Sequence, residues 1–220
     1  MKYAANEAEI LRSLPLHAHI VRVVDVLNYN ARTYIVQELC SGMDLYQHME
    51  AHGPLTEPEV KHVTRHMLSA LRHCHMNGVA HGDVKPENMM LCNGGECECR
   101  LAEQTVKLID FGAARQAGKP TRAALCARDS CSTPMYTSPE VLSGCGASPA
   151  CDVWSLGVTL CVLLAGGRVD AHMPTRSMSE AALEGAGASP PLAEMVRAML
   201  RHSPEKRITA EQALAHACLV

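Results

Sequence analysis

Large aromatic residues are nearly absent from this 220-residue chain, which has one Phe, one Trp and five Tyr. Neither sign of charge dominates, since 20 Lys and Arg residues stand against 23 Asp and Glu residues. A near-neutral balance gives no electrostatic reason to expect binding to nucleic acid or to an anionic membrane. We therefore expect no nucleic-acid partner and no membrane association.

Long apolar segments are also missing. Residues 1–10 contain no core of a signal peptide. The longest charge-free stretch, residues 153–167, is short for a bilayer span and contains three glycines, which favours a buried core helix. These absences predict a cytoplasmic protein and leave a nuclear location open.

The eleven cysteines do not suggest a disulfide framework, because their number is odd and no secretory signal is present. Cys92, Cys97 and Cys99 lie close together in the sequence, but a structural zinc site needs a fourth ligand. We favour reduced loop thiols over zinc here and leave the role of this cluster open. Most of the twelve histidines occupy polar helical positions, which predicts solvated side chains, with His81 as the exception.

Hydrophobic periodicity predicts a small β-hairpin followed by a largely helical body. Residues 7–14 have helical spacing and end at Pro15, and residues 20–27 and 33–36 are β-rich runs that form the hairpin. Further helices are expected to begin near Asp44, Thr56, Asp152, Ser189 and Thr209, two of them with capping boxes. Two segments, residues 93–103 and 166–189, are expected to be irregular.

The only Phe lies in one of two motifs that carry chemistry. Residues 81–88 read His-Gly-Asp-Val-Lys-Pro-Glu-Asn, and residues 110–112 read Asp-Phe-Gly after an apolar run at 106–109 that predicts a strand. Two acids, an amide and a lysine thus surround one potential site. Such a set could hold a metal-bound triphosphate and position a hydroxyl group for attack on it.

These motifs, followed by Ser138-Pro139-Glu140, resemble those of the eukaryotic protein kinases of the serine/threonine type, which read H-R-D-L-x-x-x-N, D-F-G and A-P-E in the same order. The resemblance covers essentially the whole chain. It implies an α+β, protein-kinase-like fold with a remnant small lobe over residues 1–40, made of one helix, a hairpin and a hinge. A nearly complete helical large lobe is expected over residues 41–220. The family's first three strands, its Gly-rich loop and its β3 lysine have no counterpart here, so an N-terminally truncated domain is expected.

The resemblance also implies catalytic roles. Asp83 would orient the attacking hydroxyl group and accept its proton, and Lys85 would offset charge on the transferred phosphoryl group. Thr133, in a segment that looks like a substrate-docking region, would bond toward both residues. Asn88 and Asp110 would hold Mg²⁺, a cation that prefers oxygen ligands.

ATP is the second cofactor that the resemblance implies. It places Glu38 and Cys40 of the connector after the hairpin, together with Glu87 and Met90, in the ATP site alongside the metal-binding pair. The implied partner is a protein substrate with a Ser or Thr hydroxyl group.

Two groups of residues match structural positions of the family. His81, Phe111, Leu11 and Val23 match a hydrophobic column, with Asp152 at its base. Glu140 and Arg207 match an ion pair of the large lobe.

The departures from the family are as informative as the matches. Glu7 matches the glutamate that pairs with the β3 lysine, but only Lys2 lies upstream of it, so Glu7 is expected to have no partner in this chain. Gly82 replaces an Arg that neutralises a phosphate on the activation loop. We therefore expect that Ser130, Ser132 and Thr133 do not form an activating phosphorylation switch.

The leading functional prediction is a serine/threonine protein kinase that binds Mg-ATP weakly and turns over little in this chain. The alternative is a pseudokinase that serves as a scaffold or regulatory binding module. A metal-binding regulatory protein that uses the cysteine cluster is a distant third. A two-stranded sheet is marginal alone and exposes an edge, which would suit a partner that covers the small lobe.

Overall fold

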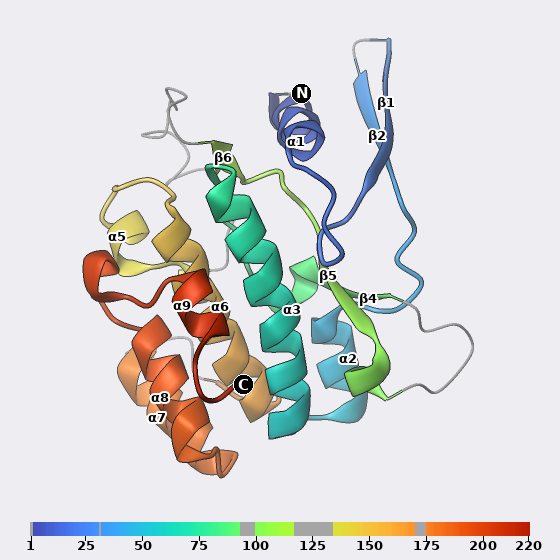
Figure 1. The fold of residues 1–220 in the computed structure, drawn as a ribbon. Helices are drawn as coiled ribbons and strands as arrows, with labels where there is room; N and C mark the ends of the chain where they lie inside the picture. Colours follow the sequence, from blue (N-terminus) through green and yellow to red (C-terminus); the bar gives the residue numbers. More distant parts are fainter. Residues whose placement is uncertain (1, 31, 93–99, 117–133, 170–174) are drawn as a thin grey trace.

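The computed structural model describes residues 2–30, 32–92, 100–116, 134–169 and 175–220. Its upper part contains helix α1 (Lys2–Ser13) and a hairpin of strands β1 (Val23–Tyr29) and β2 (Arg32–Gln37), as Figure 1 shows. A larger helical part lies below. Within the described residues the β1–β2 sheet has two antiparallel strands, which leaves both of its edges unpaired.

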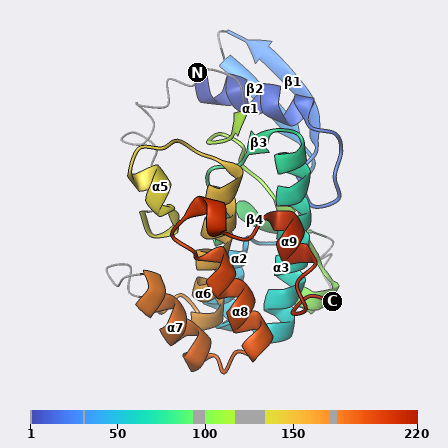
Figure 2. The same ribbon diagram turned by 60° about the vertical axis from the view of Figure 1, so that its left-hand side comes forward.

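Two long helices, α3 (Glu57–Met76) and α6 (Pro149–Ala165), form the centre of the helical part, and the view in Figure 2 shows the shorter helices around them. The shorter helices are α2 (Leu45–His52), α5 (Pro139–Leu142), α7 (Thr175–Gly185), α8 (Pro190–Met199) and α9 (Ala210–Leu214). Single 3₁₀ turns occur at Pro86–Asn88, Leu101–Glu103, Pro134–Tyr136 and Pro204–Lys206. Two further pairs of antiparallel strands lie in the described residues: β3 (Val79–Ala80) pairs with β6 (Arg115–Gln116), and β4 (Met89–Cys92) pairs with β5 (Thr105–Leu108).

Helix α3 begins and ends where the sequence predicts. The backbone amide of Thr56 donates to the Glu59 carboxylate at 2.8 Å, which is half of the predicted capping box. The helix ends at the cap residue Asn77, and Gly78 follows with φ of +71°. The helix that begins after Ser189 and the capping box at Thr209 are likewise confirmed.

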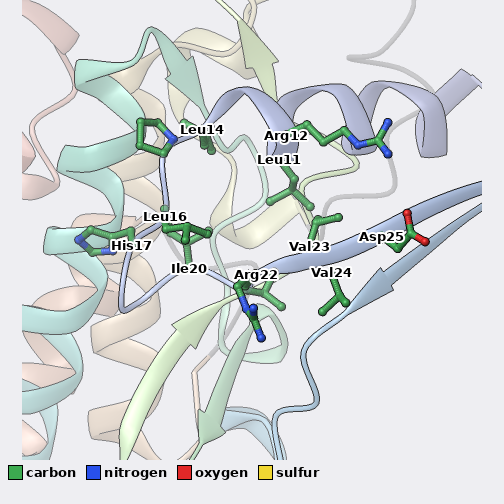
Figure 3. Close-up of a pocket in the computed structure, with 12 residues that line it drawn as sticks. Leu11, Arg12, Leu14, Leu16, His17, Ile20, Arg22, Val23, Val24 and Asp25 are labelled. Carbon is green, nitrogen blue, oxygen red and sulfur yellow. The ribbon is translucent and has the colours of Figure 1, made fainter.

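The junction between α1 and β1 contains a pocket of about 390 Å³ (Figure 3). All of its lining residues lie between Leu11 and Asp25. Leu11 extends from α1 toward Val23 of β1, while Arg12, Arg22 and Asp25 bring charge to the rim. None of the residues predicted to bind ATP or metal lines this pocket.

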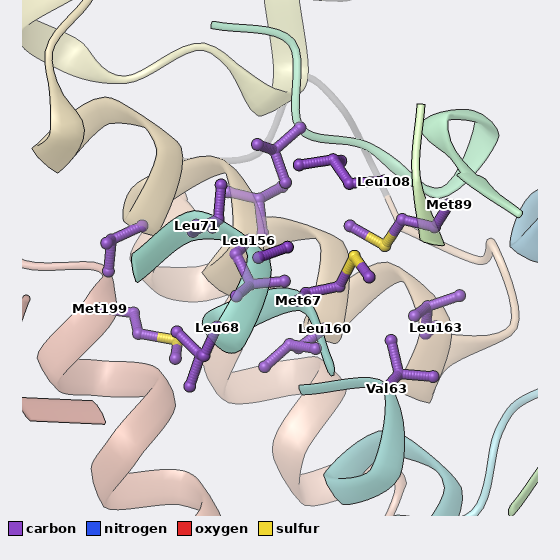
Figure 4. Packing of buried hydrophobic residues seen from close by; sticks show 14 of the residues in the cluster. Val63, Met67, Leu68, Leu71, Met89, Leu108, Leu156, Leu160, Leu163 and Met199 are labelled. Carbon is purple, nitrogen blue, oxygen red and sulfur yellow. The ribbon is translucent and has the colours of Figure 1, made fainter. Parts of the chain in front are cut away.

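The hydrophobic core lies between α3, α6, α8 and the β4–β5 pair, as Figure 4 shows. The α3 face that periodicity predicts is buried, with no more than traces of exposure for its apolar side chains. Core residues from these elements include Val63, Met67, Leu68, Leu71, Met89, Leu108, Leu156, Leu160, Leu163 and Met199. Burying one such Leu or Met side chain stabilises the fold by about 1.5–3 kcal/mol.

The prediction that residues 166–189 are irregular is wrong for the described part of that segment. Helix α7 covers Thr175–Gly185 and buries Met178, Ala182 and Leu183 against the body of the molecule. The Gly, Ala and Ser content of the segment conceals this short apolar stripe. The other segment expected to be irregular contains the 3₁₀ turn Leu101–Glu103, while residues 93–99 lie outside the described residues.

The first predicted strand also begins later than expected. Ile20 and Val21 do not belong to the hairpin but contact β5, since the backbone amide of Val21 donates to the carbonyl of Leu108 at 3.0 Å. The amide of Leu108 in turn donates to the carbonyl of His19 at 2.9 Å. Residues 19–21 therefore fix the upper part of the chain to the strand that precedes the predicted metal loop.

The prediction of solvated histidines is wrong for a cluster of five, which we call the histidine cluster: His17, His19, His62, His66 and His73. Each is partly buried, and the rings of His19 and His66 stack with centroids 3.9 Å apart. The three histidines of the cluster that belong to α3 lie on the side of the helix that faces residues 15–19 and β5. The helical period alone does not show that this side is covered.

The described residues contain neither a membrane-spanning helix nor a cluster of metal-binding side chains. No helix in the described part of the chain has the length and hydropathy needed to cross a bilayer. Among the same residues, no three His, Cys, Asp or Glu side chains come together as a metal-binding group. Cys97 and Cys99 of the cysteine cluster lie outside the described residues.

Candidate active site

Strand pairing brings the two predicted functional loops together. Residues 81–88 connect β3 to β4, and residues 109–114 connect β5 to β6. Because β3 pairs with β6, the start of the first loop lies beside the end of the second. Because β4 pairs with β5, the end of the first loop lies beside the start of the second. The sheet register therefore forces the loops to lie side by side, although they are more than 20 residues apart in the sequence.

Direct contacts join the loops along their length. The backbone amide of Ile109 donates to the carbonyl of Asn88 at 3.0 Å. The buried His81 ring donates from Nε2 to the carbonyl of Ile109 at 3.0 Å and packs edge-on against Phe111, with centroids 4.7 Å apart. The amide of Asp83 donates to Nδ1 of His81 at 3.3 Å, so both ring nitrogens have a hydrogen-bond partner.

Asp83, Lys85 and Asn88 form one hydrogen-bonded group. Oδ2 of Asp83 accepts from Nζ of Lys85 at 2.7 Å and from Nδ2 of Asn88 at 3.0 Å. Nδ2 of Asn88 also donates to the backbone carbonyl of Asp83 at 2.7 Å. Both donor positions of this amide are thus used, which fixes its orientation and leaves its oxygen as the group available to a ligand.

Asp110 has an unusual backbone conformation. Its φ is +58°, and Asn30 is the other described non-glycine residue with a positive φ. Oδ1 of its exposed carboxylate accepts from the amide of Gly112 at 3.1 Å. Left-handed backbone costs a non-glycine residue about 1–3 kcal/mol and is found preferentially at functional sites. This strain supports a functional role for the loop.

Asp152 of α6 anchors the base of the site. Its fully buried carboxylate accepts from the amides of His81 at 2.9 Å and Gly82 at 2.8 Å, and from Nε2 of His75 at 2.8 Å. Burial raises the pKa of Asp152, but the hydrogen bonds from His75 and from the amide of Gly82 are among the effects that outweigh it, so the pKa is lowered. Asp152 therefore remains ionised and holds the loop in place through its backbone.

Glu7 has partners that the sequence does not reveal. Its half-buried carboxylate accepts from the Gln37 side chain and from the backbone amide of Phe111, so it has hydrogen-bond partners, although neither is the lysine that the family pairs with it. Burial raises the pKa of Glu7, the charge of Asp110 raises it further, and these two hydrogen bonds oppose the rise. Glu7 thus sits beside the predicted metal loop, in contact with neutral donors.

The four predicted ATP-site residues lie on the connector and around β4. Glu38 accepts from the amide of Arg22 at 2.8 Å and pairs with Nζ of Lys107 at 2.5 Å, so its carboxylate is held by protein groups. Cys40 is partly exposed. The backbone of the partly buried Met90 forms an antiparallel β-bridge with the backbone of Asp44. One carboxylate oxygen of Glu87 is buried and has no hydrogen-bond partner among the described residues. Whether these four residues contact ATP stays a prediction.

Part of the predicted site lies beyond the described residues. Thr133, Ser130 and Ser132 are in this group, so their predicted roles have no structural counterpart here. Three residues of the predicted hydrophobic column belong to the core region. Leu11 and Phe111 are buried in the core, and Val23 packs against it.

Gly82 occupies the position at which the family has Arg, and its surroundings predict that an Arg here would destabilise the fold. Its φ is +79°, and an added Cβ would lie 3.0 Å from the carbonyl oxygen of Ala113. We expect Gly82→Arg to lower the free energy of unfolding by about 1–3 kcal/mol, measured by urea denaturation. Gly53→Arg is the control, because Gly53 has φ of +88° but open space around its Cα. Equal losses in the two variants would show that the contact with Ala113 is unimportant.

Comparisons with known proteins agree with this geometry. The family model described as "Protein kinase domain" matches residues 1–219. The chain is 35% identical over 217 residues to CBL-interacting protein kinase 29 of Oryza sativa subsp. japonica, covering 96% of this chain and 46% of that protein. It is 31% identical over 222 residues to a probable myosin light chain kinase of Dictyostelium discoideum, covering 98% of this chain and 68% of that protein. The chain thus spans about half the length of the first relative.

Among solved structures, the crystal structure of the Rad53 kinase domain and SCD2 is similar, with a TM-score of 0.78 and 25% sequence identity. The match covers all of this chain and 78% of that one. This likeness, with few strands and a helical body, confirms the predicted α+β fold. The division into parts at residue 40 stays a prediction.

Proposed function

Because the chain belongs to the protein kinase family, we propose that it transfers the γ-phosphoryl group of ATP to a Ser or Thr hydroxyl group of a protein, at a low rate in the 220-residue chain. The observation that carries this proposal is the arrangement of Asp83, Lys85 and Asn88 in one hydrogen-bonded group beside Asp110. Phosphoryl transfer depends mainly on alignment and charge neutralisation, and this set provides groups for both.

The donor set fits a magnesium ion. The oriented amide of Asn88 leaves an oxygen free, and Asp110 contributes an exposed carboxylate two residues beyond β5. Hard oxygen ligands of this kind are the ones Mg²⁺ prefers. When bound, Mg²⁺ would neutralise charge on the β- and γ-phosphates. Asn88 and Asp110 are the residues we propose to hold it.

Asp83 and Lys85 would act on the reacting groups. Lys85 and Asn88 both bond to Oδ2 of Asp83, which leaves Oδ1 to accept the proton of the attacking hydroxyl group. The Lys85 ammonium lies 2.7 Å from Oδ2, and its positive charge would offset the charge that develops on the transferred phosphoryl group. One relative is named a CBL-interacting protein kinase and another a probable myosin light chain kinase, which supports a protein hydroxyl group as the acceptor.

The low rate of transfer that we propose reflects how few groups in these 220 residues could bind the phosphates of ATP. No Gly-rich turn precedes Glu7 in this chain, and the Glu7 carboxylate accepts from neutral donors rather than from a lysine. Phosphate binding by backbone amides and a cation is a main source of affinity in this chemistry. We therefore propose weak binding of Mg-ATP by the chain as given.

The state of Glu7 also favours a second candidate function, a pseudokinase scaffold or regulatory binding module. The exposed side chains of the hairpin, which include Leu27, Tyr29, Tyr34 and Val36, would suit a protein partner that covers the edge of the sheet. A scaffold of this kind has no chemical need for Asp83, Lys85, Asn88 and Asp110 together, which is why we rank it second.

A transfer assay with radiolabelled ATP tests the proposal. We expect slow transfer to a generic protein substrate by the wild-type chain, and a further loss of about 10²–10⁴-fold in Asp83→Asn, because this variant cannot accept the proton. Asp25→Asn is the control, since Asp25 is exposed on β1. Transfer by Asp83→Asn at the wild-type rate would contradict the proposal, and no transfer by any variant would favour the scaffold.

A further inference from the structure

The connector between β2 and α2 runs against β4 in close contact. The amide of Gly42 donates to the carbonyl of Leu91 at 3.0 Å, and the amide of Leu91 donates to the carbonyl of Met43 at 3.0 Å. Asp44 and Met90 form the next antiparallel bridge. A Cβ on Gly42 would lie 2.6 Å from the carbonyl oxygen of Leu91, so only glycine permits this approach. The two backbones are therefore fixed relative to one another at this point.

This pairing brings together two cysteines that are 52 positions apart. Cys40 lies just before Gly42 on the connector, and Cys92 is the last residue of β4. The Cys40 thiol is close enough to raise the pKa of the Cys92 thiol, whose Sγ donates to the carbonyl of Met90 at 3.9 Å. Cys40 is partly exposed, whereas Cys92 is only 6% exposed. One thiol of the pair is thus open to a reagent in solution, and the other is held beside it.

Charged groups surround the buried thiol. Burial raises the pKa of the Cys92 thiol to about 12, and the neighbouring Cys40 adds to this rise. The Lys107 ammonium opposes it, while Glu38, which is paired with Lys107, adds to it. Cys92 is therefore a poor first target for oxidation, because the thiolate is the reactive form. Cys40 is the residue that a reagent meets first.

We propose that Cys40 and Cys92 form a reversible modification site, in which hydrogen peroxide or a similar two-electron oxidant converts the thiol pair to a disulfide. The Cys40 thiolate attacks one peroxide oxygen, the O–O bond breaks, and hydroxide leaves, giving the sulfenic acid of Cys40. The sulfur of Cys92 then attacks the sulfur of Cys40, an S–S bond forms and the S–O bond breaks. The proton from the Cys92 thiol leaves with the hydroxyl group as water. In total, two thiols and one peroxide give one disulfide and two waters.

The disulfide would join the connector covalently to β4, the strand that directly follows residues 81–88. Exchange with a small thiol such as glutathione would restore the reduced pair, because the Cys40 side is accessible to an attacking thiolate. The modification does not depend on phosphoryl transfer, so it would occur whether or not the proposed function is correct.

Peptide mapping of the folded chain tests the site directly. Cleavage after Glu separates the relevant cysteines, because Cys40 falls in residues 39–50, Cys92 in 88–96, Cys97 in 97–98 and Cys99 in 99–103. After treatment with peroxide, we expect the intact mass to fall by two hydrogen atoms. A linked peptide of residues 39–50 and 88–96 should appear in the unreduced digest and vanish on reduction.

Variants identify the pair. Cys40→Ser and Cys92→Ser should each abolish the linked peptide, while Cys145→Ser, which removes an exposed cysteine beyond α5, should retain it. Circular dichroism melts of the reduced variants show that each is folded before oxidation. A link from Cys92 to Cys97 or Cys99, or oxidation of Cys40 to the sulfinic acid with no linked peptide, would overturn the proposal.

Discussion

Replacing Arg207 with Met is expected to lower the free energy of unfolding by about 3–5 kcal/mol, because it leaves a mostly buried carboxylate without its partner. The Arg207 guanidinium is fully buried and binds the Glu140 carboxylate through two contacts of 2.6 and 2.9 Å. It also donates to the carbonyls of Ala150 at 2.7 Å and Arg201 at 3.0 Å, and it lies over the Trp154 ring, 5.0 Å from its centroid. This confirms the ion pair that the resemblance implies.

Arg197→Met is the matched control for this prediction. Arg197 also binds the Glu180 carboxylate through two contacts, at 2.8 and 2.6 Å, but its side chain is 53% exposed. Exposed pairs of this kind contribute about 0.2–1 kcal/mol. Urea denaturation of the two variants should therefore give clearly different losses. If Arg207→Met costs no more than Arg197→Met, burial does not determine the strength of these pairs.

Mild acid is expected to destabilise the fold through the histidine cluster. Burial, with the charges of His73 and His19, lowers the pKa of His17 to about 4, and burial, with the charges of His19, His62 and Arg65, lowers the pKa of His66 to about 3. The folded state therefore keeps both rings neutral when the unfolded state, with a pKa near 6.5, takes up protons. Stability is fully present above pH 6.5 and is lost as the pH falls toward 4.

The loss of stability in mild acid through His17 and His66 amounts to a few kcal/mol at most. Between pH 7 and pH 5 the two rings together would cost up to about 4 kcal/mol, and about 2 kcal/mol once their partial exposure to solvent is considered. Urea denaturation across this range measures the loss. His66→Gln keeps an acceptor for the amide of Val106, which lies 3.3 Å from Nδ1 of His66, but does not titrate. Its stability should depend less steeply on pH, and a slope equal to that of the wild type would contradict this explanation.

The helices with clear periodicity and caps were predictable from the sequence. The Thr56 cap, the buried stripe of α3 and the Pro190 start of α8 each depend on neighbours within one or two turns. Helix α7 was not predictable in the same way, because its apolar stripe is short and lies in a segment rich in small residues. Local signals identify elements only where the pattern is long enough.

The site shows the same distinction. The motifs at residues 81–88 and 110–112 indicate the chemistry, because their residue types and order are specific. The partners of Glu7 could not be predicted, since Gln37 and Phe111 are distant in sequence and only the fold brings them to its carboxylate. The pairing of Ile20 and Val21 with β5 depends on the same kind of long-range contact.

The proposed phosphoryl transfer depends most on a metal–nucleotide site formed by Asn88 and Asp110 beside Asp83. Paramagnetic broadening by Mn²⁺ and ATP in NMR spectra of the labelled chain tests it directly, because this effect detects weak binding at a defined place. We predict selective broadening of the Gly112 amide and the Asn88 side-chain amide, lost in Asp110→Asn. Unchanged signals at these two groups, with broadening elsewhere such as the pocket between α1 and β1, would contradict the account.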